Sequence, residues 1–304
     1  MSSVTIDKAG PTRTRPKYGS MKRDRAWALR WSYFFLTLFA IFFLLPPIYM
    51  FITSLKTSAE ISAAKSPWWV FNPTFNNYVE LVGSSHYLTF FKNSAIVSLS
   101  VVAITMLIAI PAAFALARMR FWGSATLATG VFLTYLIPET LLFLPLFKMF
   151  AVFNEITGIQ LLNRWWVLLI VYPTLTVPFC TWIMIGYFAS IPKELDEAAI
   201  IDGASWVQTL IRIFVPVALP GIIAATIFAF TVSWAQFLYP IAFTTSTDQL
   251  VLPVGIITTL VRGDVFAWGH IMTGALVGAA PPLIIYAFLM DYYIAGLTAG
   301  ATKG

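Results

Sequence analysis

The chain has 304 residues, of which 59% are hydrophobic, 16% are aromatic and only 11% are charged. A soluble domain carries about a quarter of its residues as Asp, Glu, Lys or Arg, so this chain has too little charge to cover its own surface in water. The composition excludes a soluble protein, a disordered chain and a small disulfide-rich secreted domain, and it predicts an integral membrane protein. The single cysteine, Cys180, excludes an internal disulfide and a cysteine metal cluster.

The net charge of +6 comes largely from the amino-terminal segment. Eight of the 19 Lys and Arg residues lie in residues 1–30, among Ser, Thr, Gly and Pro. Such a segment buries too little apolar surface to fold alone, so we predict a flexible basic arm over 1–30. By the positive-inside rule, this arm would hold the amino terminus in the cytoplasm.

Six apolar segments are long enough to cross a membrane, because a helix needs roughly 20 apolar residues to span the hydrocarbon core. Unbroken apolar runs favour helices over the alternating pattern of a barrel strand. The predicted fold class is therefore an all-α integral membrane protein, with six transmembrane helices in one domain over 31–295. The spans are expected at about 31–53, 93–117, 121–147, 165–189, 222–244 and 271–290, and the third is interrupted by Pro138-Glu139 and by Pro145.

Six spans place both termini on the same side of the membrane. If that side is the cytoplasm, the cytoplasmic segments hold 13 Lys and Arg residues and the external segments hold 6. This excess predicts that both termini are cytoplasmic, including a short tail at 296–304. Two longer segments then lie outside, at 54–92 and 245–270. The first contains Pro, Asn and Trp residues and is expected to form a small folded cap at the level of the lipid headgroups.

The cytoplasmic segment between the fourth and fifth spans, residues 190–221, is unlike the rest of the chain. It concentrates four of the 13 acidic residues in nine positions. Pro192 is expected in the first turn of a helix, where the acidic residues favour the positive end of the helix dipole. Gly203 is expected to stop this helix in a left-handed conformation. The helix would have an apolar flank of small residues formed by Leu195, Ala198, Ala199 and Ile201.

A second short helix is predicted directly after the first. Ser205 and Gln208 have the spacing of a capping box, in which each side chain bonds a backbone N–H near the helix start. Pro216 is expected to end this helix. The segment 190–221 is therefore predicted to be a helix-turn-helix on the cytoplasmic face that offers an acidic-edged knob to a partner.

The spacing of residues in this loop resembles a known signature. The run reads Glu197-Ala198-Ala199, three residues, Gly203, nine residues, Ile213, one residue, and then Val215-Pro216. It is similar to the EAA loop of permease subunits in bacterial ABC importers, where Leu-Pro closes the motif. The stretch 296–304 resembles the tail of the carbohydrate-importing, MalG-like subgroup. The resemblance covers the chain from about residue 25 to its end.

The resemblance implies the type I ABC importer permease fold and a division of labour among subunits. The expected partners are a second, related permease subunit of the MalG/MalF type, two ATP-binding subunits and an external solute-binding protein, with a sugar, oligosaccharide or polyol as cargo. The chain contains no Gly-Lys pair and hence no phosphate-binding loop. We therefore expect no enzymatic activity and no bound cofactor in this chain, with ATP and Mg used by the partner ATPases.

The resemblance also implies which residues couple the permease to the ATPases. The loop helix would enter a groove of one ATPase, where the alanines permit close approach and the acidic residue accepts charge-assisted hydrogen bonds. Closure of the ATPase pair would then move the loop as a rigid unit and switch the spans between inward-open and outward-open states. The residues implied in coupling are Glu197, Ala198, Ala199, Asp202, Gly203 and Pro216.

Three residues near the spans are candidates for the translocation path. Glu139 either sits at the external interface, where the third span ends near Pro138, or faces the path, because ionisable groups within spans often line cavities. Trp234 and Gln236 could stack on and hydrogen-bond a sugar. Family members often have Trp-Asn-acidic-Phe at this position, whereas this chain has Trp-Ala-Gln-Phe, which favours helix packing for both residues.

Three other function classes remain as alternatives. An ABC permease for a non-carbohydrate solute keeps the architecture, but the tail argues against it. An ion-coupled secondary transporter would carry buried acids in its spans, which are almost absent here. An intramembrane enzyme would need a Ser/His/Asp or metal constellation. His86 and His270 are far apart in sequence with no acidic or cysteine companion at ligand spacing, so we expect no metal site.

Overall fold

The computed structural model describes residues 20–301 except 64–65, 85, 120 and 263–264. Residues 1–19 of the predicted arm and residues 302–304 of the predicted tail lie outside the described residues. The chain divides into two units, residues 1–49 and residues 50–304, which are described separately below. Five described helices are long and apolar enough to cross a membrane, and a bent pair of helices raises this number to six.

The described part of the first unit belongs to one long helix, α1 (Ser20–Ser54), which continues into the second unit. Its apolar, span-like part runs from Asp24 to Ser54 and includes the predicted first span. The prediction of a flexible arm over 1–30 is wrong for residues 20–30, which are helical. The helical turns of the span extend backwards through Ala26, Trp27 and Leu29, residues that tolerate or favour helix.

Two short helices lie in the predicted cap, and a much longer helix begins near its end. α4 contains the predicted second span and begins six residues earlier, at Tyr87. It runs without a break through Pro111. The helices are α2 (Ser58–Ser62), α3 (Asn76–Ser84) and α4 (Tyr87–Arg118).

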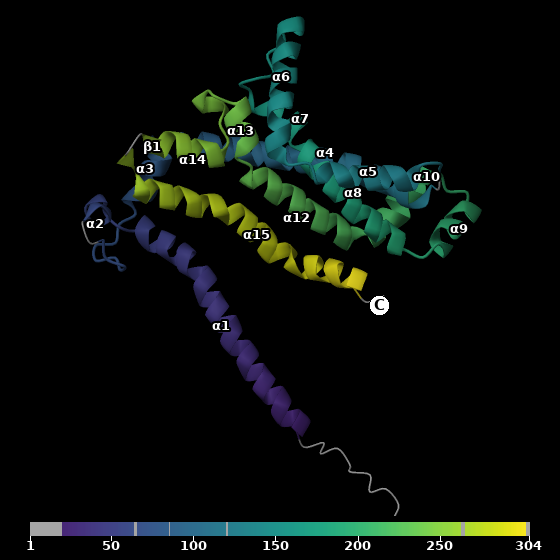
Figure 1. The fold of residues 1–304 in the computed structure, drawn as a ribbon, viewed down its shortest axis with the longest axis horizontal. Coiled ribbons are helices and arrows are strands. Elements are labelled where there is room, and N and C mark those ends of the chain that lie inside the picture. The colour runs from purple at the N-terminus through teal and green to yellow at the C-terminus, as the bar shows by residue number, and fades with distance from the viewer. Residues whose placement is uncertain (1–19, 64–65, 85, 120, 263–264, 302–304) are drawn as a thin grey trace, which may run out of the picture. The chain divides into compact units, whose positions relative to one another are not determined.

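In the structure, the region of the predicted third span, 121–147, contains two helices instead of one. α5 (Ser124–Tyr135) has only 12 residues, too few to cross a bilayer alone. α6 (Glu139–Thr157) begins after Pro138 and runs in a different direction (Figure 1). Proline donates no backbone hydrogen bond, and it disfavours helical backbone in the residue before it. The Pro138-Glu139 pair therefore separates two helices.

The predicted fourth span, 165–189, corresponds to a long apolar helical stretch whose first turns are irregular. The apolar stretch Trp165–Ser190 contains a short 3-10 turn followed by two helices. These elements are η1 (Trp165–Val167), α7 (Leu168–Val171) and α8 (Pro173–Ser190).

The segment after α8 forms the predicted helix-turn-helix, but its second helix does not end at Pro216. The helix passes through a π-helical turn and reaches Val217, and a bend of 82° at Ala218 leads into the next span. The wide π turn accommodates Pro216, which has no N–H to donate to the preceding turn. The elements are α9 (Glu194–Ile201), α10 (Trp206–Thr209), η2 (Leu210–Phe214), α11 (Val215–Val217) and α12 (Leu219–Ala235).

The predicted fifth span, 222–244, is also interrupted. Gln236 has extended backbone between α12 and the short α13 (Leu238–Phe243). A small external segment and the last long helix complete the described chain. They are η3 (Thr247–Gln249), α14 (Leu252–Leu260), the antiparallel two-residue strands β1 (Val261–Arg262) and β2 (Val265–Phe266), and α15 (Trp268–Ala301).

The core of the second unit lies where α4, α8 and α12 pack together (Figure 1). Small side chains such as Ala109, Ala113 and Ala225 let the helix backbones approach closely, as is usual between membrane helices. The hydroxyls of Thr105 and Thr176 lie 2.6 Å apart and join α4 to α8 by a buried hydrogen bond. Cys180 is fully buried in this core, where it acts as a small packed side chain, as expected.

Candidate functional site

The turn that separates the two helices of the loop forms through local sequence signals. Gly203 has a φ of +75°, which confirms the left-handed stop of α9. The Ser205 hydroxyl accepts from the Gln208 N–H, and the Gln208 side chain accepts from the Ser205 N–H, which confirms the capping box. Pro192 lies just before α9 rather than inside it, and its carbonyl accepts a hydrogen bond from the Leu195 N–H at 3.4 Å.

The two alanines of the motif face opposite environments. Ala198 is exposed, whereas Ala199 is 3% exposed and packs against its own chain. In this conformation Ala199 is therefore unavailable to a partner, contrary to the expectation for both alanines. The small side chain instead lets α9 lie close to the rest of the chain, where the Ala199 carbonyl accepts from the Ala204 N–H at 2.9 Å.

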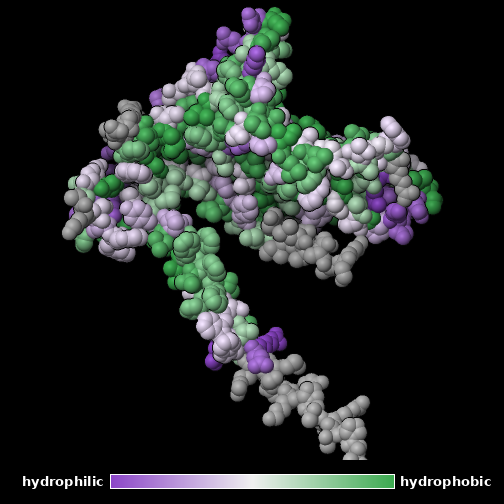
Figure 2. All heavy atoms as spheres, viewed as in Figure 1, coloured by the Kyte–Doolittle hydropathy of each residue, from purple (hydrophilic) through white to green (hydrophobic). Residues whose placement is uncertain are grey.

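The outer face of the loop combines acidic and apolar side chains. Glu197 and Asp202 are exposed, and so are large apolar residues, of which Ile201 is 84% exposed. Figure 2 shows hydrophilic side chains gathered at the end of the molecule where α9 lies. Apolar side chains presented to water beside charges are typical of a surface that a protein partner covers. The remaining exposed apolar residues are Ile200, Val207 and Ile211.

Arg118, the last residue of α4, connects this loop to the helix bundle through several contacts. Its guanidinium donates to the Ile191 carbonyl at 2.6 Å and lies 3.5 Å from the Asp196 carboxylate. It also stacks over the Phe214 ring, with 4.8 Å between the guanidinium carbon and the ring centroid. The side chain is only 4% exposed, so the contacts form in surroundings where charge interactions are strong.

Sequence reasoning assigned Arg118 only to the count of cytoplasmic positive charges. Its partners Asp196 and Phe214 lie 78 and 96 positions further along the chain, and no local pattern links them. One available signal is that Asp196 lies in the first turn of an exposed helix while an arginine ends a neighbouring span. Arginine is the residue best suited to bond a carbonyl and an acid at once.

The second candidate site brings together two of the three path residues. The side-chain amide of Gln236 donates to the Glu139 carboxylate at 2.9 Å, although the residues are 97 positions apart. Its carbonyl oxygen accepts from the N–H groups of Phe237 and Leu238 and so caps α13. Gln236 is buried and Glu139 is half-buried. The break between α5 and α6 therefore meets the break between α12 and α13.

A cavity of about 420 Å³ opens beside Glu139. Its wall includes aromatic rings, a hydroxyl and the carboxylate, from Tyr135, Phe228, Thr174 and Glu139. The buried hydroxyl of Tyr172 has no hydrogen-bond partner among the described residues. Such a mixture of aromatic faces and polar groups is suited to a neutral polar molecule.

Trp234 does not join this cavity. Its indole N–H donates to the Gly278 carbonyl at 2.9 Å, and its ring stacks on Phe230 with centroids 5.4 Å apart. The residue is buried between α12 and α15, which agrees with the packing interpretation. Among the described residues, no cluster of three His, Cys, Asp or Glu side chains could hold a metal ion.

Relatives of this chain are membrane permeases. The sulfoquinovosyl glycerol transport system permease SmoH of Agrobacterium fabrum is 35% identical, with 86% of this chain and 89% of the relative covered. The inner membrane ABC transporter permease YcjP of Escherichia coli is 32% identical over 88% and 94%. The trehalose/maltose permease MalG of Thermococcus litoralis is 33% identical, also over 88% and 94%.

Solved structures share the fold. A bacterial ABC transporter that imports the acidic polysaccharide alginate has a chain that superposes with a TM-score of 0.76 at 20% identity, covering 92% of this chain and 100% of the other. The predictions of an all-α membrane fold and of an ABC importer permease are confirmed, and the chain is a multi-pass protein of the inner membrane. Residues 105–298 match the binding-protein-dependent transport system inner membrane component, and the chain belongs to this family.

Proposed function

We propose that this chain is the permease subunit of an ATP-driven importer for a sugar or an oligosaccharide. The assignment of the cargo class is supported by the relatives that match nearly the whole chain. Those with a named cargo include permeases for sulfoquinovosyl glycerol, diacetylchitobiose and trehalose or maltose. These compounds are all glycosides, so the shared chemistry is a polyhydroxylated ring. An uptake or binding assay with sugars and polyols alongside amino acids and peptides separates this cargo from the non-carbohydrate alternative.

The transport cycle requires three kinds of partner, which we propose from the family. A second permease subunit would complete the membrane path, two ATP-binding subunits would bind and hydrolyse ATP with Mg, and an external binding protein would deliver the cargo. One solved relative is an alginate transporter in complex with its pentasaccharide-bound periplasmic protein. Orientation follows from this assignment, with α9 in the cytoplasm and the cap outside. Both termini would then be cytoplasmic, in agreement with the positive-inside rule.

The outer face of α9 is the proposed contact with an ATPase subunit. Ile201 and Ala198 would pack in a groove, while Glu197 and Asp202 would accept hydrogen bonds from basic residues at its edge. Gly203 would hold the turn, and Pro216 would lie at the bend behind it. Because Arg118 holds α9 to the end of α4, movement of the ATPase would reach the bundle directly.

The test of this contact is a charge reversal. Glu197→Lys is expected to abolish cargo-stimulated ATP hydrolysis in the reconstituted complex, because it places a cation against the proposed basic groove. The matched control is Glu155→Lys, a reversal of another exposed glutamate on α6. Normal coupled hydrolysis by Glu197→Lys in an assembled complex would refute the contact.

The cavity beside Glu139 is the proposed point at which this subunit contacts its cargo. Broken helices that meet at a polar pair are a common form of transport site, because helix breaks free polar groups within an apolar bundle. The Glu139 carboxylate would accept from sugar hydroxyls, and the Tyr135 and Phe228 rings would cover a sugar face. The Trp234 indole is bonded to the Gly278 carbonyl inside the bundle, so we assign Trp234 no contact with the cargo.

Substitution of the carboxylate separates a path role from a structural one. Glu139→Gln keeps a similar shape, so it is expected to retain assembly while lowering uptake, because it removes the charged acceptor. Glu155→Gln on the same helix is the control. If uptake at equal expression is unchanged in Glu139→Gln, the carboxylate has no role in the path.

A further inference from the structure

The predicted cap lies between α1 and α4 in the structure, so the name cap is used below for residues 55–86. One stretch of it exposes four large aromatic side chains. These side chains are between 64% and 71% exposed. Single exposed apolar residues are common, but four within eight positions form an interaction surface. This surface, called the aromatic face, consists of Trp68, Trp69, Phe71 and Phe75.

A buried lysine ties the aromatic face to the end of a membrane span. Lys56 is fully buried, and its ammonium donates to the Ser66 hydroxyl at 3.3 Å and to the Pro67 carbonyl. Pro67 directly precedes Trp68, and Lys56 lies two residues beyond Ser54, where the span-like helix α1 ends. The aromatic face is therefore held close to the end of this span-like helix.

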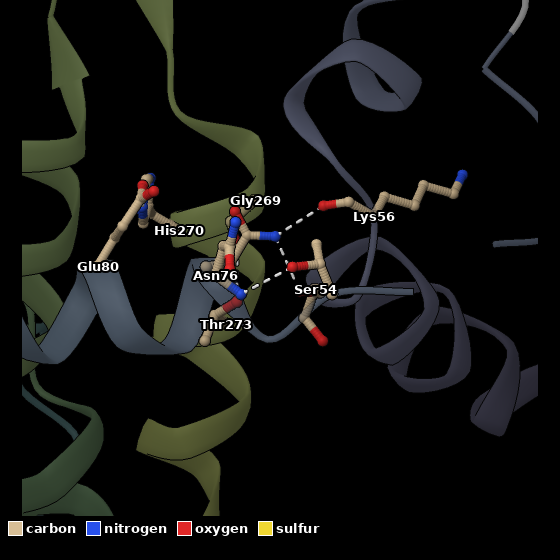
Figure 3. Close-up of polar contacts among 9 residues, drawn as sticks. Ser54, Lys56, Asn76, Glu80, Gly269, His270 and Thr273 are labelled. Atoms are coloured by element: carbon tan, nitrogen blue, oxygen red, sulfur yellow. Dashed lines mark hydrogen bonds and ion pairs between the residues drawn. The ribbon is translucent and has the colours of Figure 1, made fainter. Parts of the chain in front are cut away.

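A second set of contacts fixes the cap to other span ends. The Asn77 side chain donates to the carbonyls of Ser54 and Lys56, both at 2.9 Å. Figure 3 labels Ser54 and Lys56 together with Gly269 and His270 of α15. It packs against Gly269 at the start of α15, where a Cβ atom would lie 2.4 Å from the Asn77 oxygen. His270, also in the first turn of α15, pairs with Glu80 of α3 at 3.1 Å. The end of α1 and the start of α15 thus meet the cap at the same level.

The backbone of the aromatic face is suited to an environment with little water. The Glu60 carboxylate accepts from the N–H groups of Phe71 and Asn72 at 3.2 and 2.9 Å, so that these donors need no water. Tryptophan is enriched at membrane interfaces because its ring is apolar and its N–H still reaches headgroups and water. Phe266 and Trp268, stacked 5.2 Å apart at the start of α15, add exposed aromatic rings near the same span end.

We propose that the cap is a lipid anchor whose aromatic face lies among the headgroups of the membrane leaflet on its side. The occupant is the lipid surface, because the contacts of Lys56 and Asn77 hold the face at the span ends rather than above them. The anchor would fix the depth of α4, of α15 and of the last turn of α1, whose ends it joins. This role is independent of the cargo and of the ATPases.

Fluorescence quenching by lipid tests the proposal on the full transporter complex. In a Cys180→Ala background, Trp69→Cys is labelled with bimane and the complex is placed in nanodiscs that contain lipid brominated near the top of its acyl chains. Quenching of the bimane fluorescence is expected, because aromatic residues at the interface lie at the depth of the headgroups. Lys193→Cys, an exposed position just before α9 that belongs to neither candidate site, is the control and is expected to show little quenching.

Two outcomes would overturn the proposal. Absence of quenching by brominated lipid at Trp69→Cys would refute the anchor, and a response only to the added solute-binding protein would assign the face to that protein instead. Lys56→Met in the labelled protein is expected to reduce the quenching at least about twofold, because it releases the Pro67 carbonyl from its donor. Full quenching in Lys56→Met would refute the part assigned to this lysine.

Discussion

Replacement of Arg118 by alanine tests whether the coupling loop is held rigidly. Arg118→Ala removes the hydrogen bond to the Ile191 carbonyl, the ion pair with Asp196 and the stacking on Phe214. The hydrogen bond from a charged donor contributes about 1.5–3 kcal/mol. The ion pair adds less, because at 3.5 Å the Arg118 Nε lacks hydrogen-bond geometry to Asp196. A local loss of about 2 kcal/mol corresponds to roughly 30-fold more frequent opening of the loop.

Hydrogen exchange of residues 190–202 measures this opening. The amides of α9 are expected to exchange roughly 30-fold faster in Arg118→Ala, while the amides of α8 keep their protection, because the loss is confined to the loop. Cargo-stimulated ATP hydrolysis is expected to fall although the unstimulated rate persists. Arg212→Ala, which removes the same charge from an exposed position of the loop, is the control. Unchanged exchange in α9 of Arg118→Ala would refute the role of this arginine as the anchor.

Three further changes test the local structure. Gly203→Ala is expected to destabilise the loop by about 1 kcal/mol, because alanine disfavours the φ of +75° at this position. Gly203→Asn is expected to cost less, because asparagine tolerates this conformation better. Equal rates of amide hydrogen exchange in the two variants would contradict this explanation. Ser205→Ala is expected to lose about 1 kcal/mol at the start of α10, seen as faster amide exchange there, and an unaltered rate would count against the capping box. Gly255→Ala places a Cβ atom 2.3 Å from the Phe90 ring and is expected to lower the stability by about 1–3 kcal/mol, measured by thermal unfolding. The control is Gly130→Ala, whose Cβ atom meets open space. Equal stability of the two variants would contradict the packing.

Features encoded by neighbouring residues could be predicted from the sequence. The left-handed Gly203 and the Ser205–Gln208 box depend on residues within one turn, so their spacing determines them. The spans follow from the scarcity of charge over long stretches. The interruption of the third span at Pro138-Glu139 is visible in the sequence, but the change of helix direction there is not, because apolar composition continues on both sides and hydropathy does not report direction.

The contacts that build the two candidate sites could not be predicted in the same way. Gln236 meets Glu139 because two helix breaks face each other across the bundle, and each break looks like an isolated interruption in the sequence. The burial of Ala199 depends on how α9 leans on the bundle, which Arg118 sets from another helix. Such contacts depend on the tertiary fold, and a single sequence carries no record of them.

The polar side chains of α4 impose an order on the insertion of the chain into the membrane. Asn93 donates to the carbonyls of Asp248 and Leu250, Ser94 accepts from the Leu252 N–H, and Thr105 pairs with Thr176. During synthesis, α4 is complete long before these partners leave the ribosome. An unpaired polar group in lipid costs free energy, so these side chains of α4 find their partners only when α8 and the segment before α14 arrive. The final packing of α4 therefore forms late in synthesis, after α8 and α12 have been made.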